Sequence, residues 1–452
     1  MKFTKFGKAL LLSALSAGVV LGTTSCVQSY SVGYLYVTGT STAQSTGNGI
    51  VSGFKIDHNT GKLTPINGLP VASGGSNPGR AVLLTGGRFL YVLNRGVNSE
   101  KGSDCTTADP CTGDNITQFS IGGNGVLSPQ ETFFPQGHNP FRMIADSQGN
   151  YLFVLDHDSP SSAACALELG AGVTACGDVS VFKIDPTTGR LSTVVNAQVT
   201  SASGVALPYF PVPANPIDFL LNQGFLLTVS GTPTTGDAVF PLTYNQTNGQ
   251  LTVNQNSAQP LSNSQTFNGL VDNATAIVAG GTIVYVLDNE PITVNGVLAS
   301  ESQILPYSVG GNGSLQTEPS GAVPDDSALA NPVALYLEYK GKWLYVANQG
   351  NNNNPSAAQS GIVGYDVFSS PTYQLTPITN PGGTVGTGAG PQCLVEDPSN
   401  QFMYTANFND STVTGRAIDQ NDGVLDNLPG SANHSYSLAG PAAWCVVTGR
   451  TS

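Results

Sequence analysis

The sequence has little charge, and most of the charge it has is negative. Only 10% of its 452 residues are charged, with 29 acidic against 16 basic residues and a formal net charge of −13. Three of the lysines lie in the first 25 residues, so the rest of the chain carries 13 bases (16 − 3) and a charge of −16. A chain this short of cations lacks the basic patches that bind nucleic acid, which argues against a nucleic-acid partner.

Long hydrophobic runs are also missing after residue 25. The apolar run Ala9–Leu21 follows three lysines and is too short to span a membrane. This pattern predicts a signal peptide over residues 1–25 and export of residues 26–452 to the cell envelope, the periplasm or the medium. Thr23–Cys26 resembles a bacterial lipobox, so we expect lipidation of Cys26 and membrane attachment through that anchor alone. Ordinary signal-peptidase cleavage, which leaves Cys26 free, is the alternative.

Familiar catalytic and metal-binding motifs are absent. The chain lacks G-x-S-x-G, H-E-x-x-H and G-x-x-x-x-G-K-[ST], which disfavours serine-hydrolase, zincin and P-loop chemistry. Its cysteines show neither C-x2-C spacing nor interleaved histidines, so we expect no zinc site. The sequence therefore predicts a protein without a metal or other cofactor.

Six cysteines follow Cys26 in the chain. Cys105 and Cys111 share one loop, as do Cys165 and Cys176, and disulfides persist in exported proteins. We therefore predict the disulfides Cys105–Cys111 and Cys165–Cys176. The last two, Cys393 and Cys445, lie in equivalent strands of neighbouring repeats but are offset by two positions, and we interpret them as buried thiols.

What the chain does contain is a short apolar strand that recurs seven times. The copies are Tyr34–Val37, Phe89–Val92, Tyr151–Val154, Phe225–Thr228, Ile283–Val286, Trp343–Val346 and Phe402–Thr405. A strand-rich repeat of this length is typical of propeller blades. Each copy is followed by another strand, a Thr-Gly or Asn-Gly hairpin and an outer strand, and is preceded by a strand that opens with Asn-Pro or Gly-Pro.

These elements predict an all-β fold, a seven-bladed β-propeller with four-stranded blades. The chain begins with the second strand of a blade, Tyr34–Val37, and ends with a first strand, Gly440–Val447. We expect the last strand to complete the first blade, which leaves no open sheet edge. The whole of residues 26–452 is then one domain, and we expect a monomer.

Strand order assigns each loop to one end of the ring. The loops after second strands and before first strands meet at one end, which collects the long insertions and the two predicted loop disulfides; we call it the long-loop end. The opposite, short-turn end has only tight turns, such as Asp146–Gly149. Functional residues are more often carried by irregular loops on a rigid scaffold, so we predict the site at the long-loop end, at the mouth of the channel.

Two arginines are candidates for substrate binding there. Arg80, Arg142 and Asp218 each lie three residues after the Asn of Asn-Pro in successive repeats, so they should approach one another around the channel. Arg80 and Arg142 could bind an anionic group with paired hydrogen bonds. The alternative is that they pair with acidic residues of the blades or pack between blades.

Two histidines are candidates for catalysis. His157 directly follows a second strand and lies between Asp156 and Asp158, so it could act as a general base on water, with the two aspartates beside the substrate. It could equally be a solvated loop histidine, or Asp-His-Asp could help to bind a cation. His138 precedes an Asn-Pro and is equally ambiguous.

The repeats resemble the seven-bladed lactonase family, which includes 6-phosphogluconolactonase-like proteins and carboxymuconate cyclases. The resemblance lies in Phe-Lys-Ile-Asp-x-x-Thr-Gly-x-Leu, Asn-Pro and Gly-x-Phe/Tyr-Leu-Tyr-Val-x-Asn, matched best by Val51–Leu63, Gly87–Asn94 and Val179–Leu191. It implies hydrolysis or closure of a cyclic ester by His and Arg residues at the channel mouth. Phe141 stands where the family implies a histidine, and Arg142 is the one residue there that we carry over. Similar strands occur in YVTN-repeat surface propellers.

Two functional hypotheses follow. In the first, the protein is a lactonase: water attacks the carbonyl of a small anionic lactone, His157 or His138 removes its proton, and Arg80 with Arg142 binds the anionic group. In the second, it is a non-catalytic exported propeller that binds an envelope or extracellular ligand.

Overall fold

The structure is a computed structural model, and it describes most of the chain after residue 29. The described residues are 30–42, 48–84, 86–96, 113–231, 236–254, 258–261, 271–290, 292–294, 297–300, 302–325, 331–350, 360–368, 373–378, 384–430 and 434–448. Cys26, Cys105 and Cys111 lie outside them, as do the predicted signal peptide and lipobox. No helix within the described ranges is long and apolar enough to cross a membrane.

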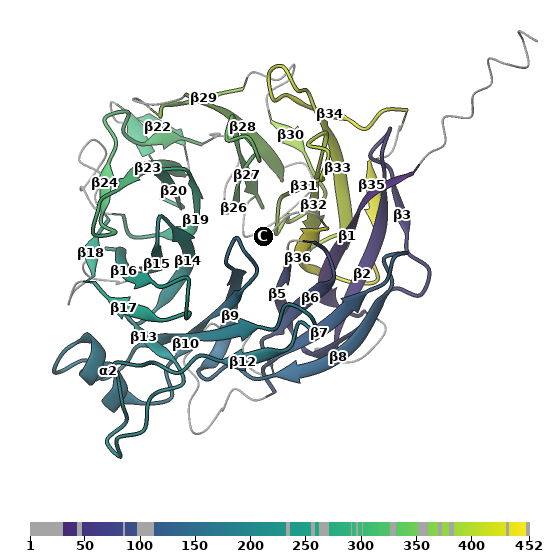
Figure 1. Ribbon diagram of the computed structural model, residues 1–452. Helices are drawn as coiled ribbons and strands as arrows, with labels where there is room; N and C mark the ends of the chain where they lie inside the picture. Colours follow the sequence, from purple (N-terminus) through teal and green to yellow (C-terminus); the bar gives the residue numbers. More distant parts are fainter. Residues whose placement is uncertain are drawn as a thin grey trace, which may run out of the picture.

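Seven antiparallel sheets form a ring around a central channel, as predicted (Figure 1). We call them blades A to G, starting with the blade that contains the beginning of the described chain. The inner strands are β36 (Ala442–Val447), β5 (Pro78–Leu83), β9 (His138–Ala145), β14 (Pro216–Asn222), β19 (Ala274–Gly280), β26 (Pro332–Leu337) and β31 (Val395–Glu396). The second strands are β1 (Ser31–Thr40), β6 (Phe89–Asn94), β10 (Tyr151–Asp158), β15 (Phe225–Ser230), β20 (Ile283–Asp288), β27 (Trp343–Asn348) and β32 (Phe402–Asn407).

The third strand of each blade pairs with the outer strand. The third strands are β2 (Asn48–Asp57), β7 (Asn115–Ile121), β11 (Gly177–Ile184), β16 (Ala238–Tyr244), β23 (Gln303–Val309), β28 (Gly361–Val367) and β33 (Thr412–Ile418). In blade B the outer strand is continuous, β8 (Leu127–Phe133). In the other six blades it is divided into two short pieces that pair with different parts of the third strand.

These divided outer strands are a difference from the predicted four uniform strands. The pieces are β3 (Leu63–Pro65) and β4 (Val71–Ser76), β12 (Leu191–Thr193) and β13 (Phe210–Val212), β17 (Leu251–Val253) and β18 (Gln259–Pro260), β24 (Leu315–Thr317) and β25 (Val323–Pro324), β29 (Leu375–Pro377) and β30 (Val385–Gly386), and β34 (Leu425–Asn427) and β35 (Ser435–Ser437). In blade A, for example, β3 pairs with Phe54–Ile56 and β4 with the other half of β2.

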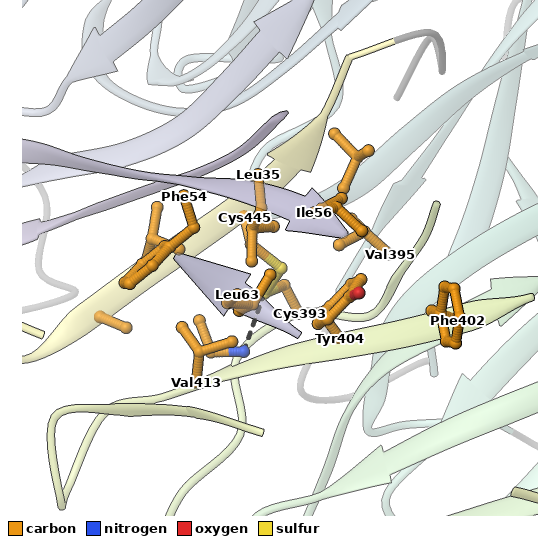
Figure 2. Close-up of a cluster of buried hydrophobic side chains, with 14 of the residues drawn as sticks. Leu35, Phe54, Ile56, Leu63, Cys393, Val395, Phe402, Tyr404, Val413 and Cys445 are labelled. Carbon is orange, nitrogen blue, oxygen red and sulfur yellow. Dashed lines mark hydrogen bonds between the residues drawn. A yellow bond between two sulfur atoms is a disulfide. The ribbon is translucent and has the colours of Figure 1, made fainter. Parts of the chain in front are cut away.

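The ring closes as predicted, by pairing of the last strand with the first. Leu35 pairs with Val447 and Val37 with Cys445, so β36 is the inner strand of blade A. Cys393, just before β31, forms a disulfide with Cys445 across the junction of blades G and A (Figure 2). The interpretation of these two cysteines as buried thiols was therefore wrong. Gly39 pairs with Ala442, two residues after Gly440, whereas the equivalent Asn407 pairs with Pro391, one residue after Gly390, so the strand register reduces the offset between the two cysteines from two positions to one.

The long loop of blade C contains a helix that the strand-rich sequence did not predict. Helix α2 (Ser162–Leu169) begins after the N-cap Ser161, whose hydroxyl accepts a hydrogen bond from the backbone N–H of Ala164. The predicted disulfide Cys165–Cys176 is present and ties this helix to the start of β11. Blade E carries an extra hairpin in the corresponding loop, β21 (Ile292–Val294) and β22 (Val297–Ser300).

The Asn-Pro motif fixes where each inner strand enters the channel. Asn77, Asn139, Asn215 and Asn331 have φ values of 52–60°, a left-handed conformation that asparagine tolerates better than most residues. The side chain of Asn77 donates to the carbonyl of Gly96, just past the second strand of the same blade. This turn sets the position of the residue three places later, which in blades B, C and D is Arg80, Arg142 or Asp218.

Neighbouring blades are joined by a repeated tyrosine hydrogen bond. The buried hydroxyls of Tyr36, Tyr91, Tyr345 and Tyr404 donate to the carbonyls of Gly125, Gly189, Gly423 and Gly61, over distances of 2.5–2.7 Å. Each acceptor is the positive-φ glycine in the hairpin of the next blade, so the Asn-Gly and Thr-Gly turns also serve blade packing. Blade E differs, because the buried Tyr285 hydroxyl has no hydrogen-bond partner among the residues that the structure describes.

This difference provides a matched test of the blade junctions. Tyr345→Phe should lower the free energy of unfolding by about 1–2 kcal/mol, because the Gly423 carbonyl loses its buried donor. Tyr285→Phe removes a hydroxyl without such a partner and should not destabilise the protein. Urea denaturation of both variants measures the difference. Equal destabilisation by the two substitutions would show that the hydrogen bond does not stabilise the junction.

Candidate functional site

The central channel contains a large cavity of about 1350 Å³. Residues of all seven inner strands line it, from the layer of Arg80 and Arg142 down to the short-turn end, where Asp146 and Glu338 belong to its wall. This volume exceeds the range of about 300–1,000 Å³ typical of small-molecule sites. The described part of the cavity therefore extends towards the short-turn end, whereas the sequence analysis placed the site at the long-loop end.

Arg80, Arg142 and Asp218 lie together in the channel, as the equivalence of their positions predicted. The strand register places Arg142 opposite Leu155 and Asp218 opposite Val229, which are equivalent positions in blades C and D. Arg142 Nε lies 3.1 Å from Asp218 Oδ1 in an ion pair between these blades. The alternative that an arginine pairs with a blade carboxylate thus holds for Arg142.

Arg80 is bound differently, by stacking. Its Cζ lies 3.3 Å from the centre of the Trp444 ring, which occupies the matching layer of blade A. Within the described part of the chain, Arg80 makes no hydrogen bond or ion pair. Burial, and then the nearby charge of Arg142, lowers the pKa of Arg80 well below its usual value, while Asp218 opposes this shift. An anion in the cavity would offset both the loss of hydration and the repulsion from Arg142, and so favour the charged guanidinium of Arg80.

The three residues leave hydrogen-bond donors facing the cavity. Arg142 uses Nε for Asp218, and neither of its Nη atoms has a partner among the described residues. Asp218 is fully engaged, because its oxygens also accept from the backbone N–H groups of Phe219 and Ile277. Two guanidinium groups with free N–H donors therefore face one cavity, an arrangement suited to a carboxylate or phosphate.

The two candidate histidines lie near the long-loop end of blade C, on neighbouring strands. His157 Nδ1 is 2.9 Å from Asp158 Oδ1, and Asp158 pairs with His138 in the β9–β10 ladder. Neither histidine is among the residues that line the cavity. The Phe141 ring lies near both groups: its centre is 6.4 Å from that of His157 and 5.2 Å from Arg142 Cζ.

Asp156 is not beside the cavity but inside blade C. It faces Asp178 on the adjacent strand, and both side chains are completely buried. Asp156 Oδ2 accepts a hydrogen bond from Ser180, and no cation forms an ion pair with either carboxylate among the residues described. Burial raises the pKa of Asp156 to about 8 and raises that of Asp178 well above its usual value. Both carboxyl groups therefore lie in the interior of the blade, where their neutral forms are favoured.

No group of three or more His, Cys, Asp or Glu side chains in the described ranges has the arrangement of a metal site. Trp444 as the partner of Arg80, and the aromatic residues at the short-turn end of the cavity, were not predicted from the sequence. Aligning the inner strands through their Pro residues does not find Trp444, because it stands three residues after Pro441 whereas each arginine stands two residues after its Pro. The strand register, in which Thr38 pairs with Trp444, places it in the layer of Arg142.

Part of the chain matches a known family model. Residues 34–207 match the family model "Lactonase, 7-bladed beta-propeller". This match runs from β1 past β12 and confirms, over that part of the chain, the resemblance found in the repeats. No curated protein matches the chain at a significant level.

Solved structures share the architecture over almost the whole ring. The "putative 6-phosphogluconolactonase" of Bacteroides uniformis aligns with a TM-score of 0.61 at 13% identity, covering 92% of this chain and 99% of that one. The periplasmic gluconolactonase of Pseudomonas aeruginosa aligns with a TM-score of 0.58 at 17% identity, covering 92% and 99%. A protein from Lactobacillus plantarum aligns with a TM-score of 0.57, also at 17% identity and with the same coverage. At these identities the similarity shows the fold.

Proposed function

We propose that the protein hydrolyses a lactone that carries an anionic group, such as the lactone of a phosphorylated or carboxylated sugar. The observation that supports this most directly is the pair of guanidinium groups with free donors in the channel, Arg80 and Arg142, in a chain with a net charge of −13. The match to the lactonase family model supports the reaction class. The names of the similar structures, 6-phosphogluconolactonase and gluconolactonase, suggest sugar lactones.

In this proposal the arginines bind and stabilise negative charge. One guanidinium binds the anionic substituent, and the other donates to the oxygen that becomes negative when water attacks the lactone carbonyl. The His157–Asp158 pair remains the candidate base, although His157 is not among the residues that line the described cavity.

The test is hydrolysis of 6-phosphogluconolactone and gluconolactone by the purified mature domain, corrected for spontaneous ring opening. Arg142→Ala should raise KM for the phosphorylated lactone about 10–100-fold, because it removes a charged hydrogen bond worth about 1.5–3 kcal/mol. His157→Ala should lower kcat by about 10²–10⁴-fold if it is the base. Arg190→Ala is the matched control, since Arg190 pairs with Glu131 on an exposed hairpin away from the channel.

The outcomes separate the parts of the proposal. Normal kcat in His157→Ala would assign the base elsewhere and keep the lactonase. No hydrolysis of either lactone by correctly folded protein would reject the lactonase and favour a propeller that binds its ligand without chemistry.

A further inference from the structure

Blade F carries a set of aromatic side chains that the fold does not require. Tyr336 on β26, Tyr339 in the turn after it, and Phe368 and Tyr373 near the β28–β29 hairpin all line the short-turn end of the cavity. Tyr339 is 71% exposed and Phe368 50% exposed. We call these four residues the aromatic shelf. The corresponding inner turns of the other blades, such as Asp146–Gly149 and Asn222–Gly224, contain no aromatic residue.

Tyr373 stands where the other blades have glycine, and this replacement has a conformational cost. Its position, two residues before the leucine that starts the outer strand, is occupied by glycine in the six other blades: Gly61, Gly125, Gly189, Gly249, Gly313 and Gly423. These glycines have positive φ, and Tyr373 has a φ of 43°. An aromatic residue in this region is strained, and such strain persists mainly where it serves a function.

The shelf is held in place from the neighbouring blades. The buried carboxylate of Glu396 in blade G accepts hydrogen bonds from the Tyr336 hydroxyl and from the backbone N–H of Tyr339. The Tyr373 hydroxyl lies 3.2 Å from Thr282 Oγ1 of blade E. The rings of Tyr336 and Tyr373 are therefore positioned before any ligand arrives, which lowers the entropic cost of binding.

The charges around the cavity favour an anionic occupant. Its lining contains four basic residues, Arg80, Arg142, Lys340 and Lys342, and three acidic ones, Asp146, Asp218 and Glu338. The whole chain has the opposite balance, 16 bases against 29 acids. The cavity is thus a local excess of positive charge in an acidic protein.

The length of the cavity favours an occupant larger than one sugar ring. Ala334 of β26 lies in the layer of the two arginines, since it pairs with Ala347 at the position equivalent to Leu155. From Ala334 to Leu337 the strand rises about 10 Å at 3.3 Å per residue, and Tyr339 lies beyond its end. A ligand that reaches both the arginines and the shelf must span more than this distance.

We propose that the channel takes an acidic oligosaccharide, whose terminal acidic ring lies at Arg80 and Arg142 while a following ring stacks on the aromatic shelf. Sugar rings present flat C–H faces that pack on aromatic rings, and their hydroxyls suit polar lining residues such as Gln223 and Gln246. This inference rests on the proposed function for the lactone at the arginine end. It deepens that function by naming a longer, charged saccharide as the substrate class.

Binding is tested with galacturonate, trigalacturonate and neutral maltotriose by isothermal titration calorimetry on the mature domain. We expect trigalacturonate to bind at least tenfold more tightly than galacturonate and than maltotriose. Tyr373→Gly restores the glycine of the other hairpins, so the protein should fold normally while the advantage of the trimer over the monomer falls at least fivefold. Tyr339→Ala should have the same effect. Phe134→Ala, which removes an equally exposed aromatic residue from the outer side of blade B, should leave all affinities unchanged.

Each result decides the inference separately from the lactonase proposal. Equal affinity for monomer and trimer, no binding of any saccharide, or an unchanged trimer advantage in Tyr373→Gly and Tyr339→Ala would overturn the shelf. Equal affinity for trigalacturonate and maltotriose would overturn the acidic specificity. Tight trimer binding by a protein that hydrolyses no lactone would retain the saccharide site and reject the reaction.

Discussion

Deletion of residues 440–452 should abolish cooperative folding. The deleted segment contains β36, the inner strand of blade A, which hydrogen-bonds β1 from Leu35 to Gly39. Cys445, Val446 and Val447 of this strand are almost completely buried and belong to the cores on both of its sides. Burial of each large side chain is worth about 1.5–3 kcal/mol, and the lost strand also exposes a sheet edge. The sum is comparable with the total stability of a typical domain, about 5–15 kcal/mol.

The experiment compares thermal unfolding of the full mature domain and the truncated one by calorimetry and circular dichroism. A sharp transition in the truncated protein at the original temperature would contradict the role of β36. The variant Cys393→Ala/Cys445→Ala is the control that keeps the strand and removes its disulfide. The bond closes a loop with a sequence separation of 52, for which chain entropy predicts a loss of about 4 kcal/mol. This variant should therefore still unfold cooperatively, at a lower temperature.

The sequence was sufficient to predict the seven-bladed ring, because each repeat contains its own structural signals. Asn-Pro marks the entry of inner strands, hairpin glycines mark the outer turns, and the apolar second strands are the most buried segments. The order of these signals along the chain also gave the closure by Gly440–Val447. The Cys393–Cys445 disulfide was missed because counting from Gly-Pro assumes that both inner strands begin pairing at the same residue, whereas blade A begins at Ala442 and blade G one residue earlier, at Pro391.

The candidate site was only partly predictable, for reasons of side-chain direction. Equal spacing after Asn-Pro was enough to bring Arg80, Arg142 and Asp218 together, because inner strands of equivalent blades face one channel. Spacing could not show that His157 lies beside Phe141 and outside the lining of the described cavity, or that Asp156 is buried in the blade opposite Asp178. The aromatic shelf is visible in the sequence only as a defect of the repeat, where Tyr373 replaces a hairpin glycine.

The second large effect that we expect is a loss of stability as the pH rises from about 4 to 8. Asp156 and Asp178 oppose each other inside blade C, where desolvation favours their neutral forms. The charges of Asp156 and Asp158 raise the pKa of Asp178 further, and the charge of Asp114 raises that of Asp156. Interactions with Ser180, with Asp178 and with the backbone N–H of Gly137 favour the ionised form of Asp156 and oppose the rise of its pKa.

The sign follows from proton binding. The pKa of Asp156 is raised from 3.8 to about 8 in the folded protein, so between these values the folded state holds a proton that the unfolded state has released. The free energy of unfolding then decreases with pH, by up to about 1.4 kcal/mol per pH unit for each such proton. Asp288, with a pKa raised by burial to about 6, and Glu290, with a pKa raised to about 8, act in the same direction.

Urea denaturation at pH 4.5, 6, 7 and 8 measures this slope for the native sequence and for Asp178→Asn. The amide cannot ionise and can still donate to Asp156, so Asp178→Asn should be more stable than the native sequence at pH 8 and have a shallower slope. Asp185→Asn is the control of opposite sign: hydrogen bonds from Thr188 and Thr187 lower the pKa of this exposed hairpin carboxylate. Its loss should leave the slope above pH 6 unchanged. Stability that is constant or rises from pH 5 to 8, or a native slope in Asp178→Asn, would show that the buried pair is not the source of the pH dependence.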